Sequence, residues 1–118
     1  MPGGERFPKS ARLRNRREFL HVQQSGTKVD AGCLLALAVP NERPFTRVGF
    51  TVSSKVGNAV VRNQIRRRLR ELFRKRAALL PVGVDVVFIA KSSAAQADFA
   101  TLARAFDTAA AKLSRQFA

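Results

Sequence analysis

Several of the residues that carry protein chemistry are scarce in this sequence. It has one cysteine, one histidine, no tryptophan and no tyrosine, and its eight acidic residues stand against 22 lysines and arginines. A lone Cys33 excludes an internal disulfide, and His21 and Cys33 alone are too few ligands for a zinc site. The cysteine content fits a reducing compartment, so we expect a cytoplasmic protein.

The few carboxylates are also spread along the chain. No two of them lie at the close spacing that would hold two metal ions or form a general acid and base pair. No serine or cysteine stands in a recognisable nucleophile motif. An independent nuclease would therefore need distant acids to converge in the fold. The sequence favours binding over catalysis, and we expect no metal bound by the protein alone.

Long apolar runs are missing, whereas positive charge is abundant. No stretch approaches the roughly 18 consecutive apolar residues of a membrane span, and we expect no membrane partner. The formal net charge of +14 attracts polyanions, of which nucleic acid is a usual partner. A basic amphipathic helix could also lie on a membrane surface, but here its apolar stripe is needed to cover a sheet.

The length of 118 residues suits a single domain with a modest core. Residues 1–14 are rich in glycine, proline and arginine without periodicity, which predicts a flexible basic arm. Residues 15–118 are then expected to form a single domain, and the positive charge predicts that it binds nucleic acid such as RNA. Asn15 and Glu18 make a possible capping box for its first helix, which Gly26 would end.

Two further helices and three strands follow in the pattern. A long helix is expected to begin at Asn58 and to end before Pro81, and the last helix has a possible capping box of Ser93 and Gln96. The strands are expected at 31–40, 48–53 and 82–90. The resulting order is α-β-β-α-β-α, with an antiparallel hairpin of the first two strands and helices free to cover one side of a small sheet.

The segment RNQIRRRLRELFRKR, residues 62–76, carries eight basic side chains and one acid. Arg62, Arg66 and Arg70 follow one another at a spacing of four on one helical face, and an apolar stripe lies on another. The stripe comprises Val61, Ile65, Leu69, Leu72 and Phe73. Because Glu71 alone cannot neutralise eight bases, a solvated surface helix explains this row less well than an external polyanion does.

The basic helix and the segments around it resemble a known family. VGFTVSSKVGNAVVRNQIRRRLRELFR, residues 48–74, resembles the protein subunit of bacterial ribonuclease P, whose basic helix opens with Arg-Asn-Arg after a strand and a glycine-containing loop. Arg62 and Asn63 match, and Gln64 stands in place of the second arginine. RLRNRREFLHVQQSGTKV is similar to the first helix of the family, and GVDVVFIAKSS to its third long strand.

The resemblance implies both a fold and a function. The fold is an α/β (α+β) two-layer sandwich with a small mixed sheet and a left-handed crossover at the basic helix, against the general right-handed rule. The function is that of a noncatalytic subunit in an endoribonuclease ribonucleoprotein. There a catalytic RNA subunit, which binds most of the Mg2+, releases the 5′ leader of precursor tRNA. The implied partners are this RNA, at one protein per RNA, and precursor tRNA.

Carried over residue by residue, the resemblance assigns two sets of site residues. The set that would bind RNA comprises Lys55, Asn58, Arg62, Asn63, Arg66, Arg67 and Arg70. The set that would line a cleft for the leader comprises Phe19, Gln23, Ser53 and Lys91. Phe19 would stack on a base, although packing in the core is its alternative role. Gln23 stands where many relatives have a second aromatic residue, and Ser54 where many have a basic one.

A structural ribosomal RNA-binding protein is the alternative from another functional class. Charge and fold class do not separate the two hypotheses. The strand, the Gly-Asn loop and the Arg-Asn helix, taken together with Phe19, favour the ribonuclease P subunit.

Overall fold

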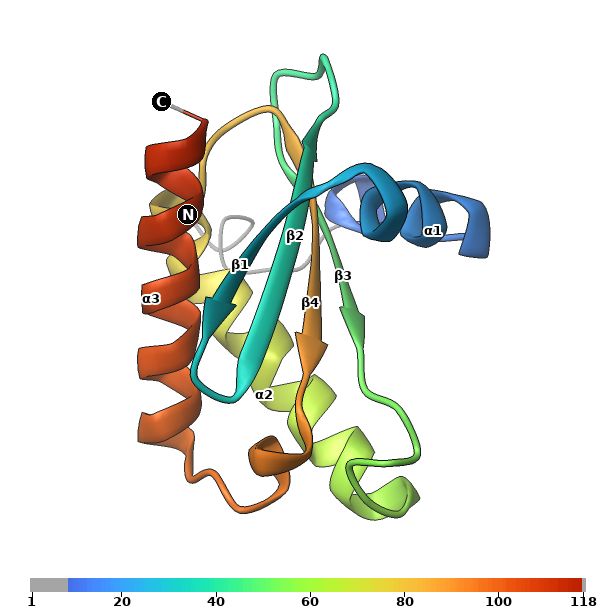
Figure 1. The fold of residues 1–118 in the computed structure, drawn as a ribbon, viewed down its shortest axis with the longest axis vertical. Helices are drawn as coiled ribbons and strands as arrows, with labels where there is room; N and C mark the ends of the chain where they lie inside the picture. The colour runs from blue at the N-terminus through green and yellow to red at the C-terminus, as the bar shows by residue number, and fades with distance from the viewer. Residues whose placement is uncertain (1–8, 118) are drawn as a thin grey trace.

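The computed structural model describes residues 9–117 of the chain, with three helices and a four-stranded sheet (Figure 1). The elements are η2 (Lys9–Ala11), α1 (Arg16–Ser25), β1 (Thr27–Ala31), β2 (Leu34–Pro40), β3 (Arg47–Thr51), α2 (Ala59–Arg76), η3 (Ala77–Leu79), β4 (Val84–Ala90), η4 (Ser92–Ala95) and α3 (Phe99–Gln116). The α+β fold with a small mixed sheet is confirmed. The predicted order lacked one strand, β1, whose sequence TKVDA buries only Val29 and Ala31 and so offers no apolar run.

The sheet has the strand order β1-β2-β4-β3, so the hairpin predicted between the strands at 31–40 and 48–53, which are β2 and β3, is wrong. β4 lies between them, antiparallel to β2 and parallel to β3. The connection from β2 to β3 passes the start of β4, where the Asn41 N–H donates to the Gly83 carbonyl and the Thr46 hydroxyl donates to the Pro81 carbonyl. β4 takes the central place because nearly all of its residues are buried.

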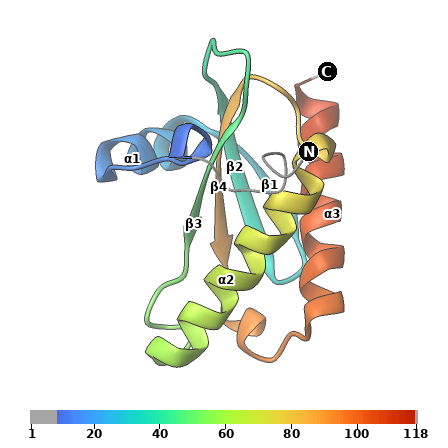
Figure 2. The same ribbon diagram turned by 180° about the vertical axis from the view of Figure 1, so that it is seen from behind.

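α2 connects the parallel neighbours β3 and β4. In Figure 2, where α2 lies in front of the sheet, the chain descends β3, returns upward through α2 and descends β4 to the right of β3. This is a left-handed crossover, in agreement with the expectation from the family and against the general rule.

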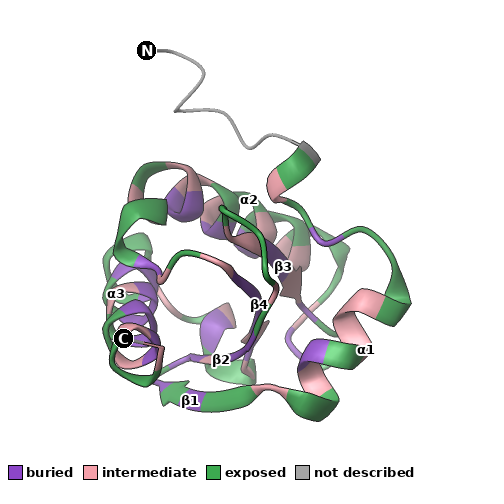
Figure 3. Cartoon of the chain, turned by 90° about the horizontal axis from the view of Figure 1, so that it is seen from above, coloured by how far each residue is buried: buried purple, intermediate pink, exposed green. Residues whose placement is uncertain are grey.

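The helices cover both faces of the sheet, not one face as we predicted (Figure 3). α2 and α3 pack on one face, around a core that includes the stacked rings of Phe88 and Phe106, 4.9 Å apart. α1 packs on the other face over a smaller cluster. That cluster comprises Leu13, Val22, Leu37, Val39 and Val87. α1 contributes its one fully buried residue, Val22, to this cluster, and Phe19 packs against it.

The predicted helix starts are confirmed for α1 and α2. Asn15 and Glu18 form the capping box of α1, and the Asn58 side chain accepts a hydrogen bond from the Val61 N–H at the start of α2. α2 buries the predicted stripe from Ile65 to Phe73, with Val61 half-buried at its edge, and it ends at Arg76 instead of running on to Pro81.

The start predicted for the last helix is wrong. Ser93 lies in the short η4 turn, and α3 is capped by Asp98, whose side chain accepts from the Thr101 N–H. An aspartate before the first helical residue satisfies an orphan N–H as well as the predicted serine would have done.

The predicted flexible arm comprises residues 1–14, of which residues 1–8 lie outside the described residues. Within the described part, Arg12 forms a bridge with Val48, and Leu13 is 6 % exposed, so the folded domain begins before residue 15. Among the helices of residues 9–117, none is long and apolar enough to cross a membrane.

Candidate nucleic-acid interface

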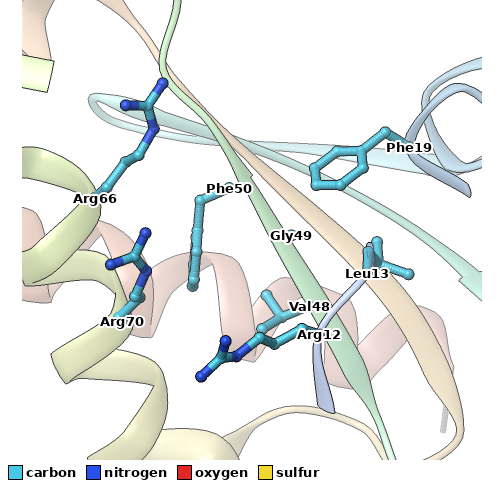
Figure 4. A pocket seen from close by; sticks show the side chains of 8 residues that line it. All are labelled: Arg12, Leu13, Phe19, Val48, Gly49, Phe50, Arg66 and Arg70. Atoms are coloured by element: carbon cyan, nitrogen blue, oxygen red, sulfur yellow. The ribbon is translucent and has the colours of Figure 1, made fainter. Parts of the chain in front are cut away.

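A hollow of about 370 Å³ lies along the edge strand β3, between α1 and α2 (Figure 4). The residues that line it are Arg12, Leu13, Phe19, Val48, Gly49, Phe50, Arg66 and Arg70. Three of these are arginines and none is acidic. The volume lies in the lower part of the range of small-ligand sites, and the charge favours an anionic ligand.

Phe19 forms the α1 side of the hollow. Its ring lies against the backbone of Gly49, so closely that a Cβ atom on this glycine would stand 2.4 Å from the Phe19 Cζ. Only a residue without a side chain allows this contact. The ring is half-buried, so part of it still faces the hollow, as Figure 4 shows.

Arg66 and Arg70 form the α2 side of the hollow. They lie four residues apart on the helix, and Figure 4 shows the Arg70 guanidinium beside the Phe50 ring and the Arg66 guanidinium farther from it. Arg66 is held in place, since its Nη2 donates to the Val52 carbonyl at 3.2 Å and its Nη1 donates to the Asn63 Oδ1 at 3.1 Å. Phe50 is fixed from behind by stacking on Phe88, 5.9 Å away. These contacts give the hollow preorganised walls.

The loop before α2 carries three of the predicted site residues, Ser53, Lys55 and Asn58, and all three are exposed. Its backbone is closed by a hydrogen bond from the Val56 N–H to the Ser53 carbonyl and by one from the Arg62 Nε to the Gly57 carbonyl at 3.1 Å. Arg62 therefore braces the loop as well as contributing charge.

The remaining residues of the basic face are exposed on α2. Asn63, Gln64 and Arg67 face solvent one to three residues from Arg66. None of the three lines the hollow, which takes only Arg66 and Arg70 from this helix. The predicted RNA-binding set is thus divided between the hollow and an adjoining outer face.

The predicted leader residues are only partly brought together. Phe19 lines the hollow, but Gln23, Ser53 and Lys91 do not. Gln23 lies half-buried one turn further along α1. Lys91 directly follows the end of β4. Its Nζ lies 2.6 Å from the Oδ1 of Asp30 in β1, the edge strand opposite β3.

An ion-pair network centred on Arg47 joins α1 to the sheet beside the hollow. The Arg47 Nε and Nη2 donate to the two carboxylate oxygens of Asp85 at 2.9 and 2.6 Å, and its Nη1 donates to the Glu18 Oε2 at 2.9 Å. Asn41 also donates to the Asp85 Oδ1 at 2.9 Å. Asp85 is 6 % exposed, and this full set of donors compensates its burial.

The same contacts determine the protonation of the two acids. Burial raises the pKa of Asp85, but the hydrogen bonds from Arg47 and Asn41 outweigh it and leave this pKa below its ordinary value. The Arg14 backbone N–H lowers the pKa of Glu18 most, and the Asn15 N–H and Arg47 add to this against partial burial. Both groups are therefore carboxylates at neutral pH, and the network is fully charged.

Several residues of this region were missed by sequence reasoning. Arg12 lay in the segment predicted as an arm, and Gly49 and Phe50 were predicted only as strand residues. Asp85 did leave a signal, because an acid inside the apolar run VDVVFIA needs a buried partner. Arg47, at the start of the preceding strand, is that partner. In residues 9–117, no group of three or more potential metal ligands comes together.

Fold and site together define a class: a small basic α+β protein with a left-handed crossover through an arginine-rich helix and an aromatic, positively charged hollow on an edge strand. Comparison with known proteins identifies the family within this class. The family model described as Ribonuclease P matches residues 7–114. The chain therefore belongs to the ribonuclease P protein family and is a protein component of that ribonucleoprotein.

Individual relatives agree with this assignment. The ribonuclease P protein component of Citrifermentans bemidjiense is 44 % identical over 112 residues, which cover 95 % of this chain and 96 % of the relative. The solved RNase P protein of Staphylococcus aureus matches with a TM-score of 0.80 at 26 % identity, covering 93 % of this chain and 100 % of the other. That of Thermotoga maritima matches with a TM-score of 0.79 at 30 % identity, covering 86 % and 96 %.

The contact between Phe19 and Gly49 can be tested by a double-mutant cycle. We expect Gly49→Ala to lower the free energy of unfolding by about 1 to 3 kcal/mol, because the new methyl group overlaps the ring. In a Phe19→Ala background the same substitution should cost much less. Urea unfolding measures all four chains, and an equal cost in both backgrounds would contradict the contact.

Proposed function

We propose that this protein binds the RNA subunit of ribonuclease P through the outer face of α2 and holds the 5′ leader of precursor tRNA in the hollow. It thereby assists the RNA-catalysed, Mg2+-dependent removal of the leader during tRNA maturation. One observation carries the proposal: three arginines and two phenylalanine rings line one hollow that adjoins an exposed arginine face.

The outer face of α2 suits a structured RNA. Asn63 and Arg67 are exposed in the first half of the helix, and Lys55 and Asn58 are exposed in the loop before it. Arginine grips phosphate with two parallel hydrogen bonds, and the N-terminus of a helix also attracts phosphate. The arginines of α2 repel one another because few acids lie among them. Phosphates of a bound RNA would neutralise this repulsion.

The hollow suits an unpaired nucleotide. A ring such as Phe19 stacks on a base for about 1 to 3 kcal/mol regardless of its identity, and Arg66 and Arg70 lie across the hollow where they can meet phosphates. A duplex would not offer its bases to the ring, whereas the single-stranded leader does. Because Gln23 replaces a second aromatic residue on α1, Phe19 is the ring that α1 contributes to stacking at this site.

Six of the seven carboxylate side chains in residues 9–117 take part in ion pairs or a helix cap, which supports catalysis by the RNA. Glu18 and Asp85 bind Arg47, and Asp98 caps α3. The other paired acids are Asp30 with Lys91, Glu71 with Arg74 and Lys75, and Asp107 with Arg76. A cluster of free carboxylates for two metal ions does not form among residues 9–117. We place the Mg2+ on the RNA, with one protein per RNA.

Reconstitution tests the proposal directly. Combining the protein with its cognate RNA subunit at low Mg2+ should stimulate cleavage of precursor tRNA, since the arginines screen phosphate repulsion and the hollow binds the leader. The control combines the RNA subunit with an unrelated basic protein of similar net charge. Without stimulation above this control, a structural ribosomal RNA-binding role would be favoured, and cleavage by the protein alone would place the active site in this chain.

The arginines of the hollow should also determine the salt dependence of RNA binding. We expect Arg66→Ala combined with Arg70→Ala to flatten the slope of log affinity against log salt by about 1.5, at about 0.7 to 0.9 per phosphate contact. The measurement is a titration of precursor tRNA into the assembled enzyme at several salt concentrations. The matched control replaces Arg104 and Arg115, two exposed arginines of α3. An equal flattening in this control would show a general charge effect and would contradict the placement.

A further inference from the structure

Two contacts join α1 to β3: the ion pair of Glu18 with Arg47 and the packing of the Phe19 ring on Gly49. They involve neighbouring residues on both elements. Glu18 and Phe19 are consecutive on α1, and their partners Arg47 and Gly49 are two apart on β3. Residues two apart in a strand point to the same face of the sheet. The ion pair and the ring contact therefore act side by side on one face, and a shift of one displaces the other.

Arg47 itself lies outside the hollow. Its Nε and Nη2 are bound by Asp85 and its Nη1 by Glu18, and its side chain is only 15 % exposed. The fork of an arginine bound by two carboxylates has a single orientation. This side chain is committed to holding two elements together and does not offer its charge to RNA.

Glu18 connects this clamp to the start of α1. Its Oε1 accepts hydrogen bonds from the Arg14 N–H at 2.7 Å and the Asn15 N–H at 3.2 Å, whereas its Oε2 binds Arg47. The same carboxylate thus caps the helix and docks it. The Phe19 contact with Gly49 and the packing around Val22 are apolar, and apolar packing is non-directional. Of these contacts, the ion pair is therefore the directional one that sets the position of the helix along β3.

We propose that Arg47 is a positioning residue for leader recognition: by clamping Glu18 to Asp85, it sets the place of the Phe19 ring in the hollow without touching RNA itself. This inference rests on the proposed function, because it concerns the leader site.

Glu18→Gln is the sharpest test, because glutamine is also accepted at this position of a capping box. The variant keeps the cap and loses the charge opposite Arg47. Glu71→Gln is the matched control, since Glu71 pairs with Arg74 and Lys75 on α2. Arg47→Lys is a second variant, which keeps the positive charge but lacks the planar fork.

The first readout uses the protein alone. The Cζ–Cε2 edge of the Phe19 ring lies against Gly49, so NMR should show a ring-current shift of a Gly49 α proton and a cross-peak from it to the ring. We expect both signals to weaken in Glu18→Gln and Arg47→Lys while circular dichroism and the Glu71→Gln spectrum remain as in the wild type. Unchanged Gly49 signals in both network variants would overturn the positioning role.

The second readout uses the enzyme assembled with its RNA subunit. The ratio of affinities for precursor tRNA and mature tRNA, which lacks the leader, isolates leader recognition. We expect Glu18→Gln to lower this ratio about 3- to 10-fold with the affinity for mature tRNA unchanged. An unchanged ratio despite displaced Gly49 signals would overturn the inference. Phe19→Ala separates the two proposals, because a wild-type ratio in that variant would refute the leader site itself, whereas the NMR result would stand.

Discussion

The packing of α2 against the sheet is the interaction on which the rest of this structure depends. The helix buries Ile65, Leu69, Leu72 and Phe73, and the left-handed crossover places it beside the edge strand β3. Its arginine face is thereby directed outward and along that edge. A right-handed crossover would place β3 on the other side of β4, where β2 already pairs. The unusual handedness and the open edge of β3 are thus linked.

The open edge explains why the hollow forms where it does. An exposed edge strand is prone to pairing with other chains. Here the Arg12–Leu13 segment pairs with Val48, and Arg66 and Arg70 line the hollow beside the strand. Positive charge discourages a second copy of the chain and attracts RNA. In the proposed function, the same feature serves as protection and as a binding surface. α1 completes the hollow from the opposite face of the sheet, where the Arg47 network holds it.

Local features of this protein could be predicted from sequence, and long-range ones could not. The caps at Asn15 and Asn58 and the apolar stripe of α2 depend on neighbouring residues, so periodicity was sufficient. The order of the strands depends on pairing between distant segments, and the short β2–β3 connection wrongly favoured a hairpin. The left-handed crossover came only from family resemblance. The hollow joins Arg12, Phe19, Gly49 and Arg66 from four segments, and no spacing in the sequence relates them.

The central claim is that two adjoining surfaces bind two different RNAs, and photo-cross-linking measures this most directly. A photoreactive phenylalanine analogue would replace Phe19 in one protein and Arg67 in another, and each would be assembled with the RNA subunit and precursor tRNA. The account predicts that position 19 cross-links to the leader and position 67 to the RNA subunit. Cross-links from both positions to the same RNA, or from position 19 to the RNA subunit alone, would contradict it.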